Sequence, residues 1–200
     1  MTYDLVLFDL GGVVVDVESD RLLHHVSQLI GRPLEDVSRA VYDEELLLPF
    51  ELGHIGPRQY YEGLNARLSL PWTYEQFVRA WNDIVRENPA VTGLVQRLGR
   101  HHKLIALSNT NVLHLRCIKA IPTLAILHDW VASCDVGLRK PDPQIYHLAV
   151  RRAGARPETT VYIDDRPELV DAGRSAGLTA IRCESAAQLE RDLRALGLTL

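Results

Sequence analysis

Four short polar segments of this sequence carry side chains whose chemistry stands out. The first is Asp9, which follows the apolar run Leu5–Phe8 and precedes Leu10, Gly11 and Gly12. An aspartate that a tight glycine turn exposes at the end of a strand can act as a nucleophile, and the free N–H groups of such a turn can hold an oxyanion. The same residues suit an aspartate that only caps a turn, so Asp9 alone leaves both interpretations open.

Two further segments could bind and neutralise an anion. Ser108 and Asn109 follow the apolar run 104–107. A hydroxyl beside free N–H donors at the start of a helix forms either a phosphate site or a plain helix N-cap. Lys140 is the second of two adjacent cations in a loop that prolines stiffen. A fixed ammonium can neutralise a carboxylate nucleophile together with a transferring phosphoryl group, whereas a lone basic pair usually lies on a solvated surface.

Asp164 and Asp165 form the fourth segment, directly after the apolar run 160–163. Adjacent carboxylates at a buried strand end repel each other unless a cation or hydrogen-bond donors compensate. Hard oxygen ligands of this kind suit magnesium, although a pair of loop acids that faces water is the alternative. Four unrelated turn caps would rarely follow four strands in this order by chance. The combined pattern therefore favours a metal-assisted site for phosphoryl chemistry.

The segments between these residues predict the elements that position them. Short apolar runs alternate with amphipathic helical patterns, which is typical of an α/β fold with a doubly wound, Rossmann-like parallel sheet. Ligands of such sheets bind outside the carboxyl ends of the strands, so one topology would bring Asp9, Ser108 and Asp164 to one edge. The expected strands are 5–8, 104–107, 131–134, 160–163 and 178–182, and the expected core helices are 90–98, 143–153 and 167–176.

Residues 17–87 change the pattern to helices alone, and we expect no strand there. We therefore predict an all-helical cap, residues 17–87, inserted into a core domain formed by residues 1–16 and 88–200. Hinges are expected near Val17 and Asn88-Pro89, and the cap would lie over the strand ends as a lid that selects the substrate. Tyr42 and His54 are candidates to face the site, although a packing or surface role suits each of them as well. The expected cap helices are 22–30, 37–47, 59–68 and 74–85.

Composition narrows the class of partner. The 200 residues carry a formal net charge of −4, which argues against nucleic acid because binding to its backbone needs a basic footprint. No stretch approaches the ~20 apolar residues of a membrane span. The three cysteines show no metal-binding or redox spacing, so a reduced, cytoplasmic setting is expected. We expect a small phosphorylated metabolite as the partner, no nucleic acid and no membrane, and the oligomeric state is left open.

In this order the four segments resemble the motifs of the haloacid dehalogenase-like hydrolase superfamily with a helical cap of the first type. The Asp9 turn is similar to the first motif, Ser108-Asn109 to the second, Lys140-Pro141 to the third and Asp164-Asp165 to the fourth. The resemblance extends over nearly the whole chain and includes the cap sequence Leu52-Gly53-His54-Ile55.

The resemblance implies a mechanism that can be carried over residue by residue. Asp9 would attack phosphorus and become an aspartyl-phosphate, while Ser108 and the Asn109 backbone hold phosphoryl oxygens and Lys140 balances their charge. Mg²⁺ would bind the Asp9 carboxylate, the backbone carbonyl of Gly11 and Asp164, and Asp165 would reach the ion through water or through another ligand. Phosphoryl transfer of this kind depends mostly on positioning and charge stabilisation.

Gly11 departs from the pattern of the superfamily. Most of its phosphatases have a second aspartate two residues after the nucleophile, which protonates the leaving group and later activates water. Gly11 keeps the backbone carbonyl but lacks that carboxyl group, and acid–base assistance is typically worth ~10²–10⁴ in rate. Phe8-Asp9-Leu10-Gly11 resembles a subgroup that includes sugar-1-phosphate phosphatases. A sugar 1-phosphate is the preferred substrate class, because an anomeric hydroxyl leaves with less protonation.

Two rival functions fit parts of the pattern. A 2-haloacid dehalogenase would use the same aspartate on carbon without a metal, but that subgroup carries a Ser-Asn type fourth motif where this chain has Asp164-Asp165. Alternatively, Gly11 could mark a catalytically weak protein that only binds a phosphorylated ligand. The joint presence of Asp9, Lys140 and Asp164 favours an active enzyme over this second alternative.

Overall fold

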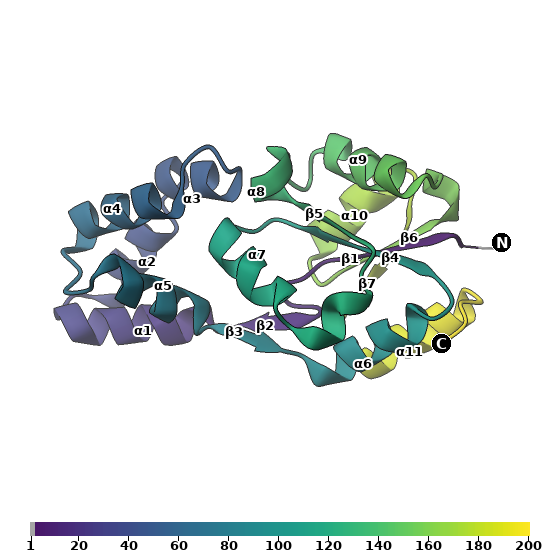
Figure 1. The fold of residues 1–200 in the computed structure, drawn as a ribbon, viewed down its shortest axis with the longest axis horizontal. Coiled ribbons are helices and arrows are strands. Elements are labelled where there is room, and N and C mark those ends of the chain that lie inside the picture. Colours follow the sequence, from purple (N-terminus) through teal and green to yellow (C-terminus); the bar gives the residue numbers. More distant parts are fainter. Residues whose placement is uncertain (1–2) are drawn as a thin grey trace.

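A five-stranded parallel sheet forms the centre of the molecule in the computed structural model, which describes residues 3–200 (Figure 1). The strand order is β5-β4-β1-β6-β7, so the first strand lies in the middle. The strands are β1 (Leu5–Phe8), β4 (Lys103–Ser108), β5 (Asp129–Ala132), β6 (Thr160–Asp164) and β7 (Thr179–Arg182). All five expected strands are therefore present, and their ends shift by at most two residues.

The apolar run of β1 explains its central place. All four of its residues are fully buried, because parallel sheets are covered by helices on both faces. Leu5 and Leu7 pack into a cluster with Ile145 and Tyr146 of α9 (Pro143–Ala153) on one face. Val6 and Phe8 belong to the larger core cluster on the other face, where α6 (Pro89–Leu98) and α11 (Ala186–Ala195) lie. This three-layered arrangement confirms the α/β doubly wound prediction.

The remaining helices of this part of the chain follow the expected alternation with strands. Helices α6, α9 and α10 (Pro167–Ser175) agree closely with the three core helices expected from the sequence. Helix α7 (Val112–Lys119) was expected only as a helix that starts near Ser108-Asn109, without bounds, whereas α8 (Ser133–Val136) and α11 were not expected. Short 3₁₀ helices lie at Pro122–Ile126 and Pro157–Thr159.

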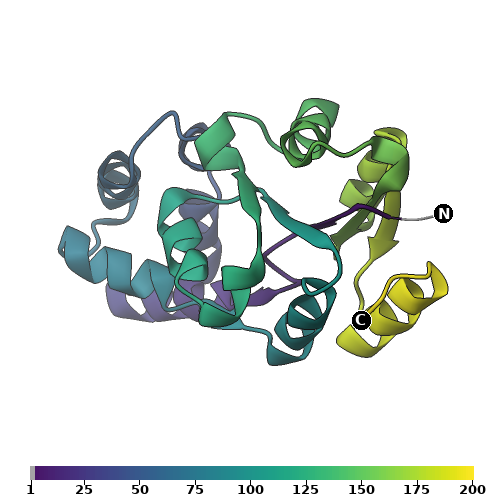
Figure 2. The same cartoon turned by 45° about the vertical axis from the view of Figure 1, so that its right-hand side comes forward.

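Five helices form a helical segment, residues 19–82, that lies beyond the carboxyl ends of the strands in both Figure 1 and Figure 2. The expectation of a single helix over 37–47 is wrong, because Asp43 starts a new helix by accepting a hydrogen bond from Glu45 N–H at 3.0 Å. The helices are α1 (Ser19–Ile30), α2 (Leu34–Val41), α3 (Glu44–Glu51), α4 (Pro57–Leu68) and α5 (Tyr74–Asn82).

A short antiparallel ribbon joins the two ends of this helical segment. Strand β2 (Val15–Val17) pairs with β3 (Val85–Glu87), and Val17 lies opposite Val85. The expectation that 17–87 contains no strand is wrong at these two ends, as is the helix expected to reach 85. Strands of three residues are too short to show an alternating pattern in the sequence. The ribbon occupies the region where hinges were expected, and the division into core and cap at 16/17 and 87/88 stays a prediction.

An aromatic cluster gives the helical segment its own interior. Tyr60 is fully buried, stacks on Phe50 with ring centroids 4.4 Å apart, and meets the ring of Trp81 edge-on at 5.2 Å. Its hydroxyl donates to the carbonyl of Val41 at 3.0 Å, so this buried polar group is paired. Aromatic pairs of this kind contribute about 0.5–1.5 kcal/mol beyond their buried area. These contacts give the helical segment a packed aromatic interior of its own.

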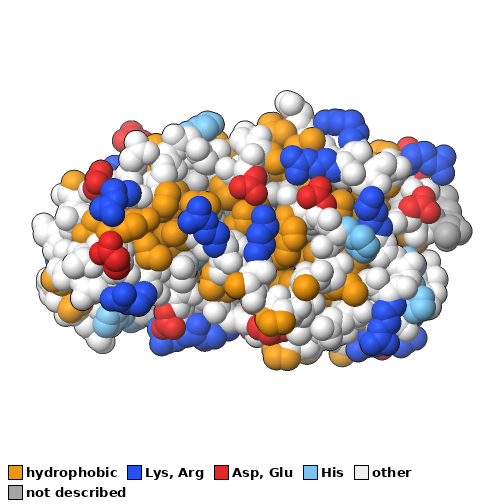
Figure 3. Space-filling view, viewed as in Figure 1, with side chains coloured by type: hydrophobic (Ala, Val, Ile, Leu, Met, Phe, Trp, Pro, Cys, Tyr) orange, Lys and Arg blue, Asp and Glu red, His pale blue; other side chains and the backbone are white. Residues whose placement is uncertain are grey.

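The outer surface mixes both signs of charge. On the face drawn in Figure 3, Lys and Arg side chains lie among Asp, Glu and apolar side chains. Exposed ion pairs such as Arg21–Asp83, at 3.0 Å, contribute only about 0–1 kcal/mol each. Within residues 3–200, no helix combines the length and the apolar character needed to cross a membrane.

Candidate active site

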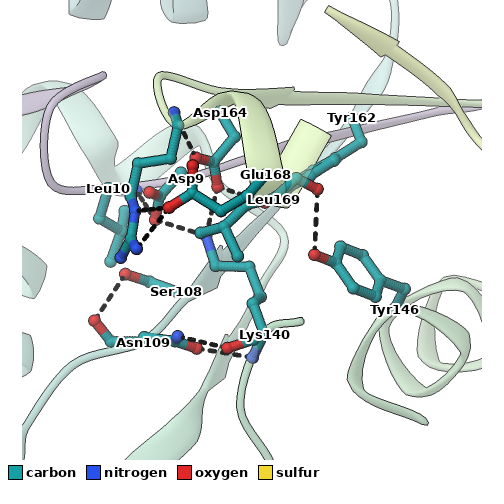
Figure 4. A network of polar contacts seen from close by, with 11 residues as sticks. Asp9, Leu10, Ser108, Asn109, Lys140, Tyr146, Tyr162, Asp164, Glu168 and Leu169 are labelled. Atoms are coloured by element: carbon teal, nitrogen blue, oxygen red, sulfur yellow. Dashed lines mark hydrogen bonds and ion pairs between the residues drawn. The ribbon is translucent and has the colours of Figure 1, made fainter. Parts of the chain in front are cut away.

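Three strand ends and one loop bring four of the sequence-predicted residues together (Figure 4). Asp9 directly follows β1, Ser108 ends β4 and Asp164 ends β6, and these strands are immediate neighbours in the sheet. Lys140 reaches the same edge from the loop before α9. All four side chains are buried, which is costly for charged groups unless they are paired with one another. Their mutual contacts therefore determine the electrostatics of the site.

Lys140 lies between the two carboxylates. Its Nζ is 3.0 Å from Asp9 Oδ1 and 2.6 Å from Asp164 Oδ2. Asn109 fixes the loop that carries this lysine, because its side-chain amide donates to the Lys140 carbonyl and accepts from the Lys140 N–H, both at 2.8 Å. The sequence placed Asn109 only as a backbone donor to phosphate. The Asn109 side chain also fixes the backbone of Lys140, 31 residues further along the chain. The spacing of residues in the sequence does not reveal such a contact.

Asp9 is oriented by its own turn. The N–H of Leu10 donates to Asp9 Oδ1 at 2.7 Å, and the backbone N–H of Asp9 donates to the carbonyl of Ile163 in β6 at 2.9 Å. Burial raises the pKa of Asp9 to about 6; the Lys140 ammonium opposes this shift, and the Asp164 carboxylate adds to it. A second cation at this place would favour the ionised form, which is the form that can act as a nucleophile.

Tyr162 forms a hydrogen bond with the Asp164 carboxylate, and the sequence analysis did not identify it as a site residue. Its hydroxyl donates to Asp164 Oδ2, while the backbone N–H of Arg166 donates to Asp164 Oδ1 at 2.9 Å. Burial and the charge of Asp164 both raise the pKa of Tyr162, so the hydroxyl keeps its proton and stays a donor. Side chains alternate along a strand, so the position of Tyr162 two residues before Asp164 was the available signal.

The residues present fit a divalent cation. One carboxylate oxygen each from Asp9, Asp164 and Asp165 lies within 4.8 Å of the other two. Asp165 Oδ1 is buried without a hydrogen-bond partner, and burial together with the charge of Asp164 raises the pKa of Asp165. Three hard oxygen ligands beside a single ammonium therefore match the donor set that Mg²⁺ prefers. Gly11, whose carbonyl is the expected fourth ligand, lies in the same turn as Asp9.

Gly12 lets the Asp9 turn approach Asp165 closely. Its backbone has φ +77°, and a Cβ placed there would lie 2.4 Å from Asp165 Oδ2. Any side chain at this position would displace the Asp165 carboxylate from the cluster. This steric limit explains why the second residue of the turn is a glycine.

Ser108 is the last residue of β4, on the opposite side of Asp9 from Asp164. The hydroxyl of Ser133 holds the loop that follows Ser108 by accepting from the Thr110 N–H at 2.9 Å and donating to the Thr110 carbonyl at 3.0 Å. Helix α7 begins at Val112, and Asn111 caps it by accepting from the N–H groups of Leu113 and His114. Ser108 therefore lies just before a helix N-terminus, as the sequence predicted, but the N-cap is Asn111. Its predicted role in holding phosphoryl oxygens stays a prediction.

A cavity of about 180 Å³ opens between the strand ends and the helical segment. Leu10, Gly11, Ser108 and Asn109 line it from the sheet side. Tyr42 lines it from the helical side, whereas His54, the other residue proposed to face the site, is exposed and does not. Most of the wall on the helical side is apolar, and it is formed by Val17, Leu22, Leu23, Val41, Leu47, Trp81, Ile84 and Val85, with Ser19 and Glu51 as polar exceptions.

Comparison with known proteins agrees with this arrangement. A family model described as haloacid dehalogenase-like hydrolase matches residues 3–177. The chain is 25% identical over 185 residues to a phosphorylated carbohydrates phosphatase of Thermotoga maritima, an alignment that covers 89% of this chain and 83% of that protein.

Solved structures share the fold at lower identity. An enzyme of the same family from Bacteroides thetaiotaomicron, in complex with magnesium and inorganic phosphate, superposes with a TM-score of 0.83 at 22% identity and covers 94% of this chain and 98% of that one. A 2-haloacid dehalogenase from Pseudomonas syringae superposes with a TM-score of 0.69 at 18% identity, over 98% and 100% of the two chains. Both kinds of enzyme therefore share this fold, and the choice between their chemistries depends on the residues of the site.

Proposed function

The chain belongs to the haloacid dehalogenase-like hydrolase family, and from that premise we propose that it is a magnesium-dependent phosphatase of a small phosphorylated metabolite that works through an aspartyl-phosphate on Asp9. The observation that carries the proposal is the buried triad in which Lys140 Nζ contacts both Asp9 and Asp164 beside a third carboxylate, Asp165. Its curated relative from Thermotoga maritima is a phosphatase as well.

Each residue has a task that follows from its position. Asp9, held by the Leu10 N–H, would present its free carboxylate oxygen to phosphorus. Lys140 and the Ser108 hydroxyl would hold the phosphoryl oxygens, and burial strengthens these contacts because water is excluded. Bound Mg²⁺, held by Asp9, Asp164 and the Gly11 carbonyl with Asp165 nearby, would supply charge stabilisation for the phosphoryl group.

The cavity supports an uncharged leaving group such as a sugar or polyol. Within the described chain, neither Lys nor Arg lines it, so it offers no cation for a second phosphate or a carboxylate of the substrate. The relative from Thermotoga maritima acts on phosphorylated carbohydrates, which is consistent with this preference. We therefore propose a sugar phosphate, with a sugar 1-phosphate as the first choice.

The experiment is a screen of sugar phosphates, nucleotides and p-nitrophenyl phosphate with Mg²⁺ and with EDTA, alongside chloride release from 2-chloropropionate. We expect phosphate release that EDTA abolishes and Mg²⁺ restores. Chloride release that EDTA leaves unchanged would establish the dehalogenase instead. The carboxylate cluster argues against that outcome, because a dehalogenase has no use for a cation-binding Asp164-Asp165 pair. If no phosphate ester is turned over, the result would favour the alternative function, a protein that binds a phosphorylated ligand without hydrolysing it.

A further inference from the structure

The leaving-group side of the site lacks a proton donor at Gly11, and the structure offers a replacement from the helical segment. We propose that Glu51, at the end of α3, is the general acid and base of the reaction and exchanges a proton with the leaving-group oxygen and then with water. This inference rests on the proposed phosphatase function. Its first support is position, because Glu51 lines the same cavity as Gly11, Ser108 and Asn109.

Glu51 is the one carboxyl group among the described residues that line this cavity, and the two other titratable groups there are unsuitable. His114 uses both ring nitrogens, one with the Trp81 carbonyl at 2.9 Å and one with the Asn111 amide at 3.2 Å. Burial also lowers the pKa of His114, so the ring stays neutral. Tyr42 is 47% exposed, which leaves its hydroxyl without the desolvated environment that tunes an acid.

The aspartates close to Gly11 in sequence lie elsewhere. Asp16 belongs to β2 and is exposed, and Asp20 in the first turn of α1 is exposed on the outer surface. Neither lines the cavity. The sequence next to Gly11 therefore places no carboxyl group at the cavity, whereas the helical segment places Glu51 there.

The end of α3 is seated firmly on the core. Gly53, with φ +73°, packs so closely on α8 that a Cβ would lie 2.2 Å from the Cys134 carbonyl oxygen. Glu51 itself forms an ion pair with Arg139 at 3.5 Å, and Arg139 is the neighbour of Lys140. The side chain of Glu51 is only 21% exposed. These contacts hold the carboxyl group beside the loop that carries the phosphate-binding lysine.

The surroundings of Glu51 also tune its acidity. Burial raises the pKa of Glu51, and the charges of Arg139 and Arg166 oppose that shift without cancelling it. The charge of Glu51 in turn contributes to the raised pKa of Tyr60 in α4, although burial of that phenol contributes more. A carboxyl group that keeps its proton closer to neutral pH is a better general acid than an ordinary glutamate.

The proton balance of the two steps closes. Asp9 attacks phosphorus, the bond between phosphorus and the leaving oxygen breaks with its electron pair on that oxygen, and the oxygen takes the proton of Glu51. The alcohol leaves, and Glu51 is then a carboxylate. Water next attacks the aspartyl-phosphate and gives one proton to Glu51, while the bond between phosphorus and Asp9 breaks with its electron pair on Asp9. Inorganic phosphate is released and both side chains return to their starting forms.

The test compares Glu51→Gln with wild type on the best alkyl phosphate of the screen and on p-nitrophenyl phosphate, whose leaving group needs no proton. The readout is kcat/KM for the alkyl phosphate divided by kcat/KM for p-nitrophenyl phosphate, measured across pH. This ratio removes every pH effect that the two substrates share. In wild type this ratio should fall as pH rises through the Glu51 pKa. In Glu51→Gln it should be ~10²-fold or more lower, within the ~10²–10⁴ range of acid–base assistance, and independent of pH.

Arg139→Gln is the matched control, because it removes the same ion pair but leaves the acid in place. It should lower kcat/KM for both esters alike, keep the ratio near its wild-type value and move the fall of the ratio to higher pH, since Arg139 lowers the Glu51 pKa. An unchanged ratio in Glu51→Gln would overturn the proposal and reduce Glu51 to a structural contact. No turnover of either ester by wild type would overturn the phosphatase function and this role with it.

Discussion

Gly11 is the residue that most clearly separates this site from the usual pattern of its family. A Cβ can be accommodated there, because at Gly11 it meets only Val17 Cγ2, at a contact distance of 3.4 Å. We therefore predict that Gly11→Asp, introduced into Glu51→Gln, recovers turnover of alkyl phosphates by a factor within the ~10²–10⁴ of acid–base assistance. Steady-state kinetics on alkyl and p-nitrophenyl phosphates measures it. A folded double variant with no recovery would show that position 11 does not reach the leaving group here.

Tyr162 provides a second residue-scale prediction. Tyr162→Phe removes one donor from the buried carboxylate of Asp164, so activity should drop several-fold and stability by about 1.5–3 kcal/mol, the range for hydrogen bonds to charged groups. Tyr146→Phe is the matched control, because Tyr146 donates to the Leu169 carbonyl at 3.2 Å and packs edge-on against Tyr162. Chemical denaturation should show a smaller loss for Tyr146→Phe, about 0.5–1.5 kcal/mol, because its acceptor is a neutral carbonyl. Equal loss of activity in the control would mean that Tyr162 acts through packing alone.

Residue identity and order were enough to predict which side chains meet at this edge of the sheet, while their roles stay predictions. Asp9, Ser108 and Asp164 each follow a recognisable apolar run, and Lys140 lies in a loop with Pro141 and Pro143. The fold brings these four side chains together. Glu51 could not be found in this way, because its meeting with the cavity depends on how α3 packs on α8.

At the scale of elements, we expect the contact between α3 and α8 to set the position of the helical segment over the strand ends. Gly53→Ala should push these elements apart, because its Cβ would lie 2.2 Å from the Cys134 carbonyl oxygen. We expect a large loss of kcat/KM together with a loss of stability.

Gly31→Ala is the control for backbone strain. Gly31 has a similar φ of +64° but meets nothing within 4 Å of a built Cβ. It should cost about 1–2 kcal/mol in unfolding free energy, the usual penalty of the left-handed conformation, with little change in kcat/KM. If both variants lose the same activity at matched stability, the seat of α3 on α8 does not govern catalysis.

Element boundaries show where sequence patterns stop being informative. The five core strands were predicted because buried apolar runs ended by polar residues have a clear signature. The division between α2 and α3 was missed because apolar spacing continues across Tyr42-Asp43, while the N-cap bond of Asp43 breaks the helix. The β2–β3 ribbon was missed because its pairing joins residues about 70 positions apart, which no local pattern encodes.

At the scale of the whole molecule, the acidic cluster should couple cation binding to folding. Wild-type protein should melt at a higher temperature with Mg²⁺, because a ligand at about 100 times its Kd adds about 2.7 kcal/mol to the stability of the folded state. Asp165→Asn should be at least as stable as wild type without Mg²⁺, because one of three mutually repelling carboxylates is removed. It should gain less from Mg²⁺. Calorimetry that shows equal gains would remove Asp165 from the cation site.

The central claim is that Asp9 carries the phosphoryl group between the two half-reactions. The direct measurement is an acid quench of wild-type enzyme during turnover of a phosphate ester, followed by peptide mass spectrometry. The account predicts a phosphoryl group on the peptide that contains Asp9, located at that residue, and none in Asp9→Asn, which should also lose turnover. Phosphate release at the wild-type rate from Asp9→Asn, or a phosphoryl group trapped on another residue, would contradict it.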